Sequence, residues 1–113
     1  MKRLMFGILS LLFLITISSC GTQSDPEYRV QNQRTSKANV QIQTSGGNTV
    51  NINDVEAGQL SEFQSTAEGD IIVTAVIQNE AVSPTTTFAA RKDKRYTIVI
   101  LTGNIPSLRV DQE

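Results

Sequence analysis

The chain has 113 residues, with eleven Asp and Glu against ten Lys and Arg, a single Cys, and neither His nor Trp. Without an imidazole base, nucleophilic sites of the Ser-His-Asp and Cys-His types are excluded, and so are zinc and copper sites built from His and Cys. The charge balance also argues against a nucleic-acid-binding protein, which needs a basic face. The length suits one small domain.

The N-terminal residues have the layout of a secretory signal. Lys2 and Arg3 form a short basic head, and an apolar run from Leu4 to Ile17 follows. This run is shorter than the ~20 apolar residues that a membrane-spanning helix needs, and no basic stop-transfer cluster comes after it. We therefore predict a helical signal peptide over residues 1–19 that is cleaved. The alternative is a permanent N-terminal membrane helix.

The end of this run, Ile17-Ser18-Ser19-Cys20, resembles the lipobox of bacterial lipoproteins. The resemblance implies cleavage before Cys20, a diacylglycerol on its sulfur and a further acyl chain on its amino group. Two or three acyl chains would hold the protein firmly on a bilayer, because each buried CH₂ adds ~0.8 kcal/mol. Cys20 is the only cysteine, so an intramolecular disulfide is impossible and a free thiol is the alternative.

The same resemblance bears on location. In lipoproteins of bacteria with two membranes, Asp directly after the acylated cysteine commonly retains the protein at the inner membrane, so Gly21 favours the outer membrane. Removal of Lys2 and Arg3 leaves eight basic against eleven acidic residues, a net charge of −3. We expect a lipidated cysteine and polar tether over residues 20–27 and a folded domain over residues 28–113. The alternative is that the tether packs on the domain.

From Tyr28 onward, apolar residues recur with period two, which is typical of half-buried β-strands. Ser45-Gly46-Gly47-Asn48 is a hairpin signal, because Gly and Asn tolerate the positive φ of tight turns, and the strands on either side should pair antiparallel. The predicted strands are residues 28–31, 39–43, 50–53, 60–66, 71–77, 85–90, 96–102 and 105–110.

Some of these segments indicate their own place in a sheet. Residues 71–77 have apolar side chains on both faces, with Ile72 and Val76 on the second one, which predicts a central strand. The first strand suits an exposed position. Residues 105–110 suit an edge, where Pro106 is tolerated because an edge has unpaired positions.

Short strands with turns at intervals of about ten residues, and no helical period beyond the signal, indicate an antiparallel sandwich or a small barrel. We predict an all-β fold, namely a small antiparallel immunoglobulin-like β-sandwich of seven or eight short strands. The chain lacks the Cys pair and the Trp of immunoglobulin domains, so this topology rests on the strand count alone.

The folded domain also resembles a bacterial family of secreted and surface β-sandwich domains of unknown function, which occur on lipoproteins or in tandem on larger envelope proteins. Two positions depart from the family pattern, since Gln41 stands where Asp is frequent and Asp93 stands where Gly is usual. The resemblance implies a fold and an envelope location, and it implies no catalytic or ligand residues. The matching segments are residues 29–32, 38–42, the Gly46-Gly47 turn, 55–58 continuing to Phe63, Gly69 with the 71–77 strand, and 94–99.

Few side chains suggest chemistry. A Ser-Lys pair would need Lys37, Lys92 or Lys94 as its base, but these lysines lie in polar turns, where a solvated lysine keeps its proton.

Two pairs of carboxylates stand close in sequence, Asp54/Glu56 and Glu68/Asp70. Either pair could serve glycosidase-type chemistry, and Asp54/Glu56 could bind calcium. Solvation of turns is the plainer explanation, because the spacing of a calcium-binding loop is absent.

Arg91-Lys92-Asp93-Lys94-Arg95 is the one dense charge cluster. It could bind lipid headgroups or an acidic partner. The alternative is a soluble turn whose charges discourage aggregation at the edge of a sheet.

These observations predict a non-catalytic lipoprotein of the cell envelope, a module for protein interaction or structural support with an envelope partner, and without cofactor or metal. The first alternative is a module that binds carbohydrate, peptidoglycan or another small ligand. A solvent-facing pair among Tyr28, Phe63, Phe88 and Tyr96 would favour it. The second alternative is an enzyme, which requires a pocket with a buried lysine or carboxylate of perturbed pKa.

Overall fold

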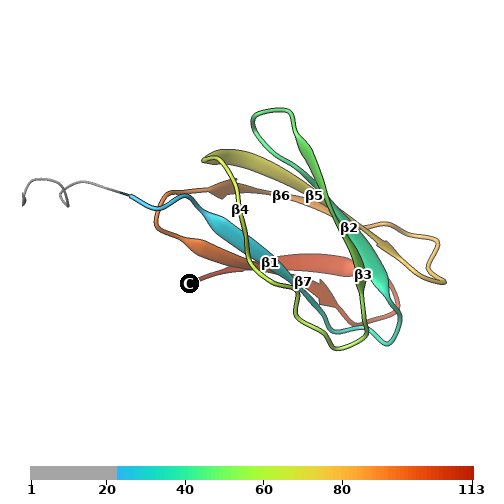
Figure 1. Ribbon diagram of the computed structural model, residues 1–113. Helices are drawn as coiled ribbons and strands as arrows, with labels where there is room; N and C mark the ends of the chain where they lie inside the picture. The colour runs from blue at the N-terminus through green and yellow to red at the C-terminus, as the bar shows by residue number, and fades with distance from the viewer. Residues whose placement is uncertain (1–22) are drawn as a thin grey trace, which may run out of the picture.

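Two four-stranded sheets face each other in the computed structural model, which describes residues 23–113 (Figure 1). The strand order is β4-β1-β7-β8 in the first sheet and β3-β2-β5-β6 in the second. The predicted all-β sandwich is thereby confirmed. The strands are β1 Glu27–Asn32, β2 Ala38–Gln43, β3 Thr49–Val55, β4 Gln64–Ser65, β5 Gly69–Ile77, β6 Thr85–Ala90, β7 Arg95–Leu101 and β8 Ser107–Gln112.

The first strand is an internal strand, not the exposed one that its sequence suggested. β1 pairs antiparallel with the short β4 on one side and parallel with β7 on the other, in register from Glu27 opposite Arg95 to Asn32 opposite Ile100. All other strand pairs are antiparallel. The alternation of Arg29 and Gln31 with buried residues misled the prediction, because both polar side chains are half-buried on the outward side of the sheet.

The predicted hairpin across the Gly-Gly turn is confirmed. β2 and β3 pair antiparallel, the Thr44 N–H donates to the Asn48 carbonyl (2.9 Å), and the Gly47 N–H donates to the Thr44 carbonyl (3.0 Å). Gly47 has a φ of 88°, which is the left-handed conformation that this position requires.

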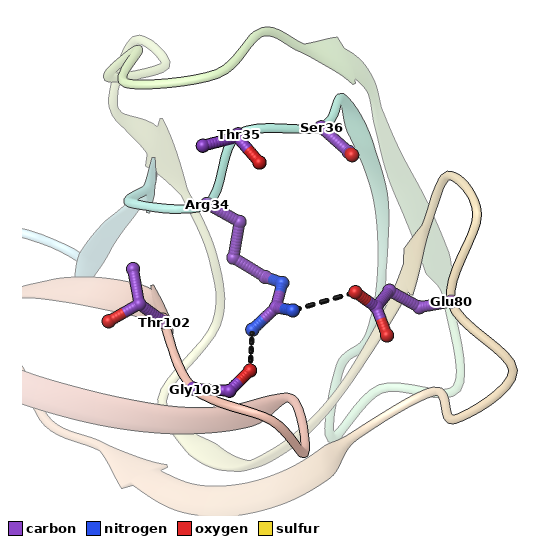
Figure 2. Close-up of a pocket in the computed structure, with 6 residues that line it drawn as sticks. All are labelled: Arg34, Thr35, Ser36, Glu80, Thr102 and Gly103. Carbon is purple, nitrogen blue, oxygen red and sulfur yellow. Dashed lines mark hydrogen bonds and ion pairs between the residues drawn. The ribbon is translucent and has the colours of Figure 1, made fainter.

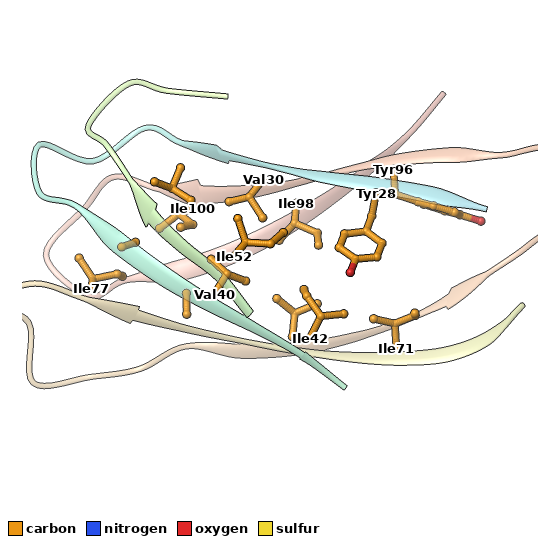
Figure 3. Close-up of a cluster of buried hydrophobic side chains, with 14 of the residues drawn as sticks. Tyr28, Val30, Val40, Ile42, Ile52, Ile71, Ile77, Tyr96, Ile98 and Ile100 are labelled. Carbon is orange, nitrogen blue, oxygen red and sulfur yellow. The ribbon is translucent and has the colours of Figure 1, made fainter. Parts of the chain in front are cut away.

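The core lies between the sheets and is built from every second residue of the long strands (Figure 3). Because side chains alternate across a strand, one face of each sheet supplies the core and the other meets solvent. The largest fully buried apolar side chains of this core are Tyr28, Ile42, Ile71, Ile77, Ile98, Ile100, Val30, Val40 and Val73. Val99, which lies on the outward side of β7 between Gln31 and Arg109, is buried as well.

β5 is central, as predicted, with β2 on one side and β6 on the other. Its second apolar face is nevertheless uncovered, since Ile72 is 41% exposed and Val76 is 54% exposed. Within residues 23–113, no other element covers the outward side of this sheet, so β5 is buried on one face only.

Two predicted strands have other bounds in the structure, since one is shorter and the last is shifted toward the C-terminus by two residues. In the segment 60–66 only Gln64–Ser65 forms a strand, and Leu60 makes a single bridge to Gln31. The last strand begins at Ser107, and Ile105 before it is 72% exposed. β8 lies at the edge of its sheet, as predicted.

The C-terminal part of the predicted tether packs on the domain. Ser24 and Asp93 exchange two hydrogen bonds, because the Asp93 N–H donates to the Ser24 carbonyl (2.9 Å) and the Ser24 N–H donates to Asp93 Oδ1 (2.7 Å). The Thr66 N–H donates to the carbonyl of Pro26 (3.0 Å), which is fully buried. Polar composition suggested a free tether, but its backbone groups find partners on neighbouring turns.

The sandwich has two ends, and these contacts lie at one of them. The N-terminal end contains residues 24–27 and the turn 91–95, beside the last residue, Glu113, whose N–H donates to the Arg95 carbonyl (2.9 Å). The far end carries the loops 33–37, 56–60, 78–84 and 102–106, on the right of Figure 1.

Candidate functional site

The outward side of the second sheet carries no charged side chain over the two described rows that cross all four strands. In one row Thr49, Gln43, Ile72 and Thr87 lie next to one another, and in the next row Asn51, Gln41, Thr74 and Thr85 do so. Asn39 and Val76 extend this surface toward the far end, where they face each other across β2 and β5. We call these ten side chains the neutral face.

Charged side chains border the neutral face at its two ends. Asp70 lies at the N-terminal start of β5, and Asp54 lies at the far end beside Lys37. The amide and hydroxyl groups between them can donate and accept hydrogen bonds, and their desolvation costs far less than that of charges. Such a surface suits contact with a partner that is itself uncharged.

The outward side of the first sheet is the opposite in character. Arg95 pairs with Glu27 (2.9 Å), Arg109 pairs with Asp111 (2.9 Å) and the Arg29 side chain donates to Thr97 Oγ1 (3.1 Å). The charges of the sandwich strands are thus concentrated on one side of the molecule.

A hollow of about 280 Å³ opens at the far corner of the neutral face, between β2, β3 and β5. Its lining combines the aliphatic Val76, the amides of Asn39 and Gln78, and the Lys37–Asp54 ion pair (3.5 Å). Val76 provides an apolar wall, while the amides and the ion pair provide hydrogen-bonding groups around it.

A β-bulge shapes this hollow. The β2–β3 register shifts between Ala38 and Val40, and Asp54 opposite the shift has a φ of 58°. The Asn39 Oδ1 accepts a hydrogen bond from the Asp54 N–H (2.7 Å) and so holds this left-handed residue in place. Bulges re-aim side chains and recur beside binding sites, so this corner is a candidate site for a ligand.

A second, smaller hollow of about 170 Å³ lies among the far-end loops (Figure 2). Arg34 dominates it, and its guanidinium donates to the carbonyls of Leu101 (2.9 Å) and Gly103 (3.2 Å) and to Glu80 Oε2 (2.7 Å). The Arg34 side chain is 11% exposed. Because Glu80 neutralises this arginine and carbonyls occupy its donors, the contacts join three loops and leave little charge to attract an anionic ligand.

Cys20, the predicted lipidation site, lies outside the described residues. Half of the basic residues in the charge cluster 91–95 are ion-paired, because Lys92 pairs with Asp25 (3.0 Å) and Arg95 pairs with Glu27 (2.9 Å), while Arg91 and Lys94 are exposed. Its contacts with residues 25 and 27 fasten the N-terminal segment, which is closer to the structural interpretation of the cluster than to a headgroup site.

The carboxylate pairs do not build a metal centre in residues 23–113, where no three potential His, Cys, Asp or Glu ligands come together. Asp54 instead faces the Lys37 ammonium (3.5 Å), which occupies the place that a cation would take. Glu68 uses its carbonyl to accept a hydrogen bond from Ser45 Oγ (3.1 Å), so its backbone serves the turn.

The four aromatic residues outside the signal make no solvent-facing pair. Tyr28 and Tyr96 are buried in the core, and Phe88 packs half-buried against Tyr96 with ring centroids 4.8 Å apart. Phe63 is covered by two guanidinium groups, of Arg29 (4.5 Å) and Arg95 (3.9 Å). The feature that would favour sugar binding by aromatic stacking is therefore missing from the described part of the chain.

Three groups of the described chain have pKa values above their ordinary ones. Burial raises the pKa of the Tyr28 phenol, the hydrogen bond with Asp25 raises the pKa of Lys92, and the hydrogen bond with Asp111 raises the pKa of Arg109. None of the three lines the neutral face or either hollow. Lys92 holds its proton more firmly than usual, which argues against it as a catalytic base.

Sequence reasoning missed the neutral face, although the signal was present. The segments 39–43, 71–77 and 85–90 contain no Lys, Arg, Asp or Glu, and all three belong to the second sheet. Only the sheet order, which brings these segments side by side, turns three neutral strands into one neutral surface.

No protein-family model and no curated protein matches this chain. A solution structure of a protein from Eubacterium rectale is similar, with a TM-score of 0.60 and 18% identity over 80% of this chain and 90% of that one. At this identity the likeness concerns the fold alone. The resemblance to the surface-domain family of unknown function stays a prediction. The described residues contain no helix of the length and apolarity needed to cross a bilayer.

Proposed function

We propose that the protein is a non-catalytic lipoprotein of the cell envelope, anchored by acylated Cys20, whose sandwich binds another envelope protein through the neutral face. The observation that supports this most strongly is the difference between the two outward faces. The face of the first sheet carries ion pairs, whereas the neutral face is uncharged and exposes Ile72 and Val76. The cores of protein interfaces are depleted of charged residues, because a charge loses its hydration when a partner covers it.

The anchor rests on the lipobox-like residues 17–20, and Gly21 favours the outer membrane over the inner. A Cys20→Ala variant should remain an unlipidated precursor that keeps residues 1–19. The measurement is metabolic labelling with a radioactive fatty acid, combined with the intact mass of the protein. Normal labelling of the variant would refute the anchor without bearing on the neutral face.

The binding face is tested by photo-crosslinking in intact cells. A photoreactive amino acid in place of Gln41, at the centre of the neutral face, should give a discrete crosslinked protein band, and the same residue in place of Arg109, on the opposite sheet, should not. Both positions are exposed strand positions, so they compare faces and not accessibility. Crosslinking at Arg109 alone would show that the charged face is the interface.

The second candidate function is binding of carbohydrate, peptidoglycan or another small ligand. The hollow beside Val76 favours it, because amides around an aliphatic wall can bind hydroxyl groups and the apolar face of a sugar. Titration with soluble peptidoglycan fragments, followed by backbone NMR shifts, tests it. Shifts confined to residues 37–39, 54 and 76–78 would support this function, and Asn39→Leu should abolish them.

A further inference from the structure

Four strands lie at the edges of the two sheets, and three of them are protected against pairing with another chain. β4 has only two residues, β8 carries the charged Arg109 and Asp111, and β3 is interrupted by the bulge at Asp54. Short length, charges and bulges are the usual means by which edge strands avoid adding a further strand.

β6 has none of these protections. Its sequence Thr-Thr-Thr-Phe-Ala-Ala contains no charge, no proline and no glycine, and its six residues pair with β5 without a register shift. β-branched and aromatic residues favour the extended conformation. β6 approaches β8 of the opposite sheet, but among the described residues no backbone hydrogen bond joins these two strands.

The backbone groups that β6 leaves open follow from its register. The Ala75 N–H donates to the Pro84 carbonyl (3.0 Å), which makes these two residues a hydrogen-bonded pair. In an antiparallel ladder such pairs alternate, so Thr86, Phe88 and Ala90 point their backbone groups toward β5. The alternate residues of the strand therefore point their N–H groups outward, and no acceptor in the described chain meets these groups. They are Thr85, Thr87 and Ala89.

The outward groups match a second copy of the same strand. With Thr87 opposite the partner's Thr87, and Thr85 opposite the partner's Ala89, the outward positions of both strands meet in three hydrogen-bonded pairs. The Ala89 carbonyl already accepts a hydrogen bond from the Tyr96 hydroxyl (3.3 Å), so the pairing uses the second lone pair of this oxygen. Cross-strand Thr–Thr pairs are favourable, and this register places no two like charges opposite each other. It also places Arg91 opposite the partner's Ser83, so the charged turn does not oppose the pairing.

We propose that two copies of this chain pair antiparallel through β6, with the two-fold axis at Thr87, into one continuous eight-stranded sheet. The contact is isologous, as in most symmetric dimers. It joins the neutral faces of both copies side by side and doubles the surface offered to a partner. The pairing is a property of the domain and depends neither on lipidation nor on the partner proposed above.

Disulfide trapping in intact cells tests the register. Hydrogen-bonded antiparallel residues have Cα atoms about 5.5 Å apart, which lies within the range that a disulfide can bridge. Thr87→Cys should therefore form a disulfide-linked dimer on mild oxidation. Thr85→Cys is the matched control, because Thr85 lies on the same strand and the same exposed face. In the proposed register Thr85 faces the partner's Ala89, so the two introduced cysteines would lie four residues apart along the strand pair. Cys20 is present in both variants and so cannot explain a difference.

Thr87→Pro provides the second arm. Proline removes an outward N–H that makes no bond to β5, so the variant should keep its melting temperature within a few degrees while a crosslinker that joins wild-type dimers no longer does so. Equal disulfide formation by the Thr87→Cys and Thr85→Cys variants, or none by either, would overturn the proposed dimer. Undiminished dimer crosslinking of a folded Thr87→Pro variant would overturn it as well.

Discussion

The Asn32 carboxamide joins the two sheets at the far end, where its Nδ2 donates to the carbonyl of Val55 at 2.9 Å. Asn32 is fully buried, and every polar group that it carries has a partner. Its Nδ2 also donates to the Ser36 carbonyl (2.7 Å), and its Oδ1 accepts from the Arg34 N–H (2.9 Å). One side chain in β1 thus holds the end of β3 and the loop before β2.

Replacement of Asn32 should therefore be costly. Asn32→Ala leaves the carbonyls of Val55 and Ser36 without this donor and the Arg34 N–H without its acceptor, and we expect a loss of about 2–4 kcal/mol of unfolding free energy. Urea denaturation followed by circular dichroism measures this loss. Gln33→Ala, at the next and exposed residue, is the control and should change stability little. Equal effects of the two substitutions would contradict the role given to the buried amide.

Tyr28 presents the opposite situation. Its ring lies between the sheets with the hydroxyl directed toward the side of Ile42 and Ile71 (Figure 3), and this hydroxyl has no hydrogen-bond partner within the described chain. Tyr28→Phe removes an unsatisfied buried group without leaving a cavity, so the variant should be as stable as the wild type or more stable by about 1 kcal/mol. The measurement is urea denaturation of both proteins, and a loss of more than about 1 kcal/mol would indicate a partner for the hydroxyl.

The same residue predicts a dependence of stability on pH. Burial raises the pKa of Tyr28 in the folded state above its ordinary value of 10.0, so the unfolded chain releases this proton first as the pH rises. The contribution of Tyr28 to stability is complete below about pH 10 and decreases as the pH rises from there toward the folded-state pKa. Denaturation curves at about pH 8 and about pH 11, on either side of the ordinary tyrosine pKa, should show a smaller loss for Tyr28→Phe than for the wild type.

Arg34 should matter for the stability of the far end. Arg34→Ala leaves the carbonyls of Leu101 and Gly103 without this donor and Glu80 without its cation, and we expect a loss of about 2–3 kcal/mol. Arg109→Ala breaks an ion pair on the exposed edge and should have little effect, because solvent screens that pair. Thermal unfolding of the two variants side by side measures the difference.

The two faces of β5 can be compared with a pair of adjacent substitutions. Val73→Asp places a carboxylate in the core and should prevent folding, whereas Ile72→Asp places the same group on the exposed side and should leave a cooperative melt. Only the second variant should remain soluble and folded by circular dichroism. The Ile72→Asp variant should also weaken any crosslink at Gln41 if the neutral face binds a protein.

The period-two pattern made most of the fold predictable, because a half-buried strand must alternate polar and apolar side chains. The Gly46-Gly47 hairpin and the central place of residues 71–77 followed from local sequence. The parallel pairing of β1 with β7 did not, because it joins segments nearly seventy positions apart and no local pattern encodes it. The Arg34–Glu80 contact and the bulge at Asp54 could not be predicted for the same reason, since both depend on residues that are distant in the sequence.

The two hydrogen bonds between Ser24 and Asp93 also decide how far the domain could travel from a lipid on Cys20. Only four residue steps separate Cys20 from Ser24, and an extended chain covers at most about 3.6 Å per residue. The free part of the tether would therefore be no longer than about 14 Å. The domain of a lipid-anchored copy would therefore be confined to a thin layer next to its own bilayer. Partners would have to enter that layer, and neighbouring copies sharing it would meet largely by diffusion in two dimensions.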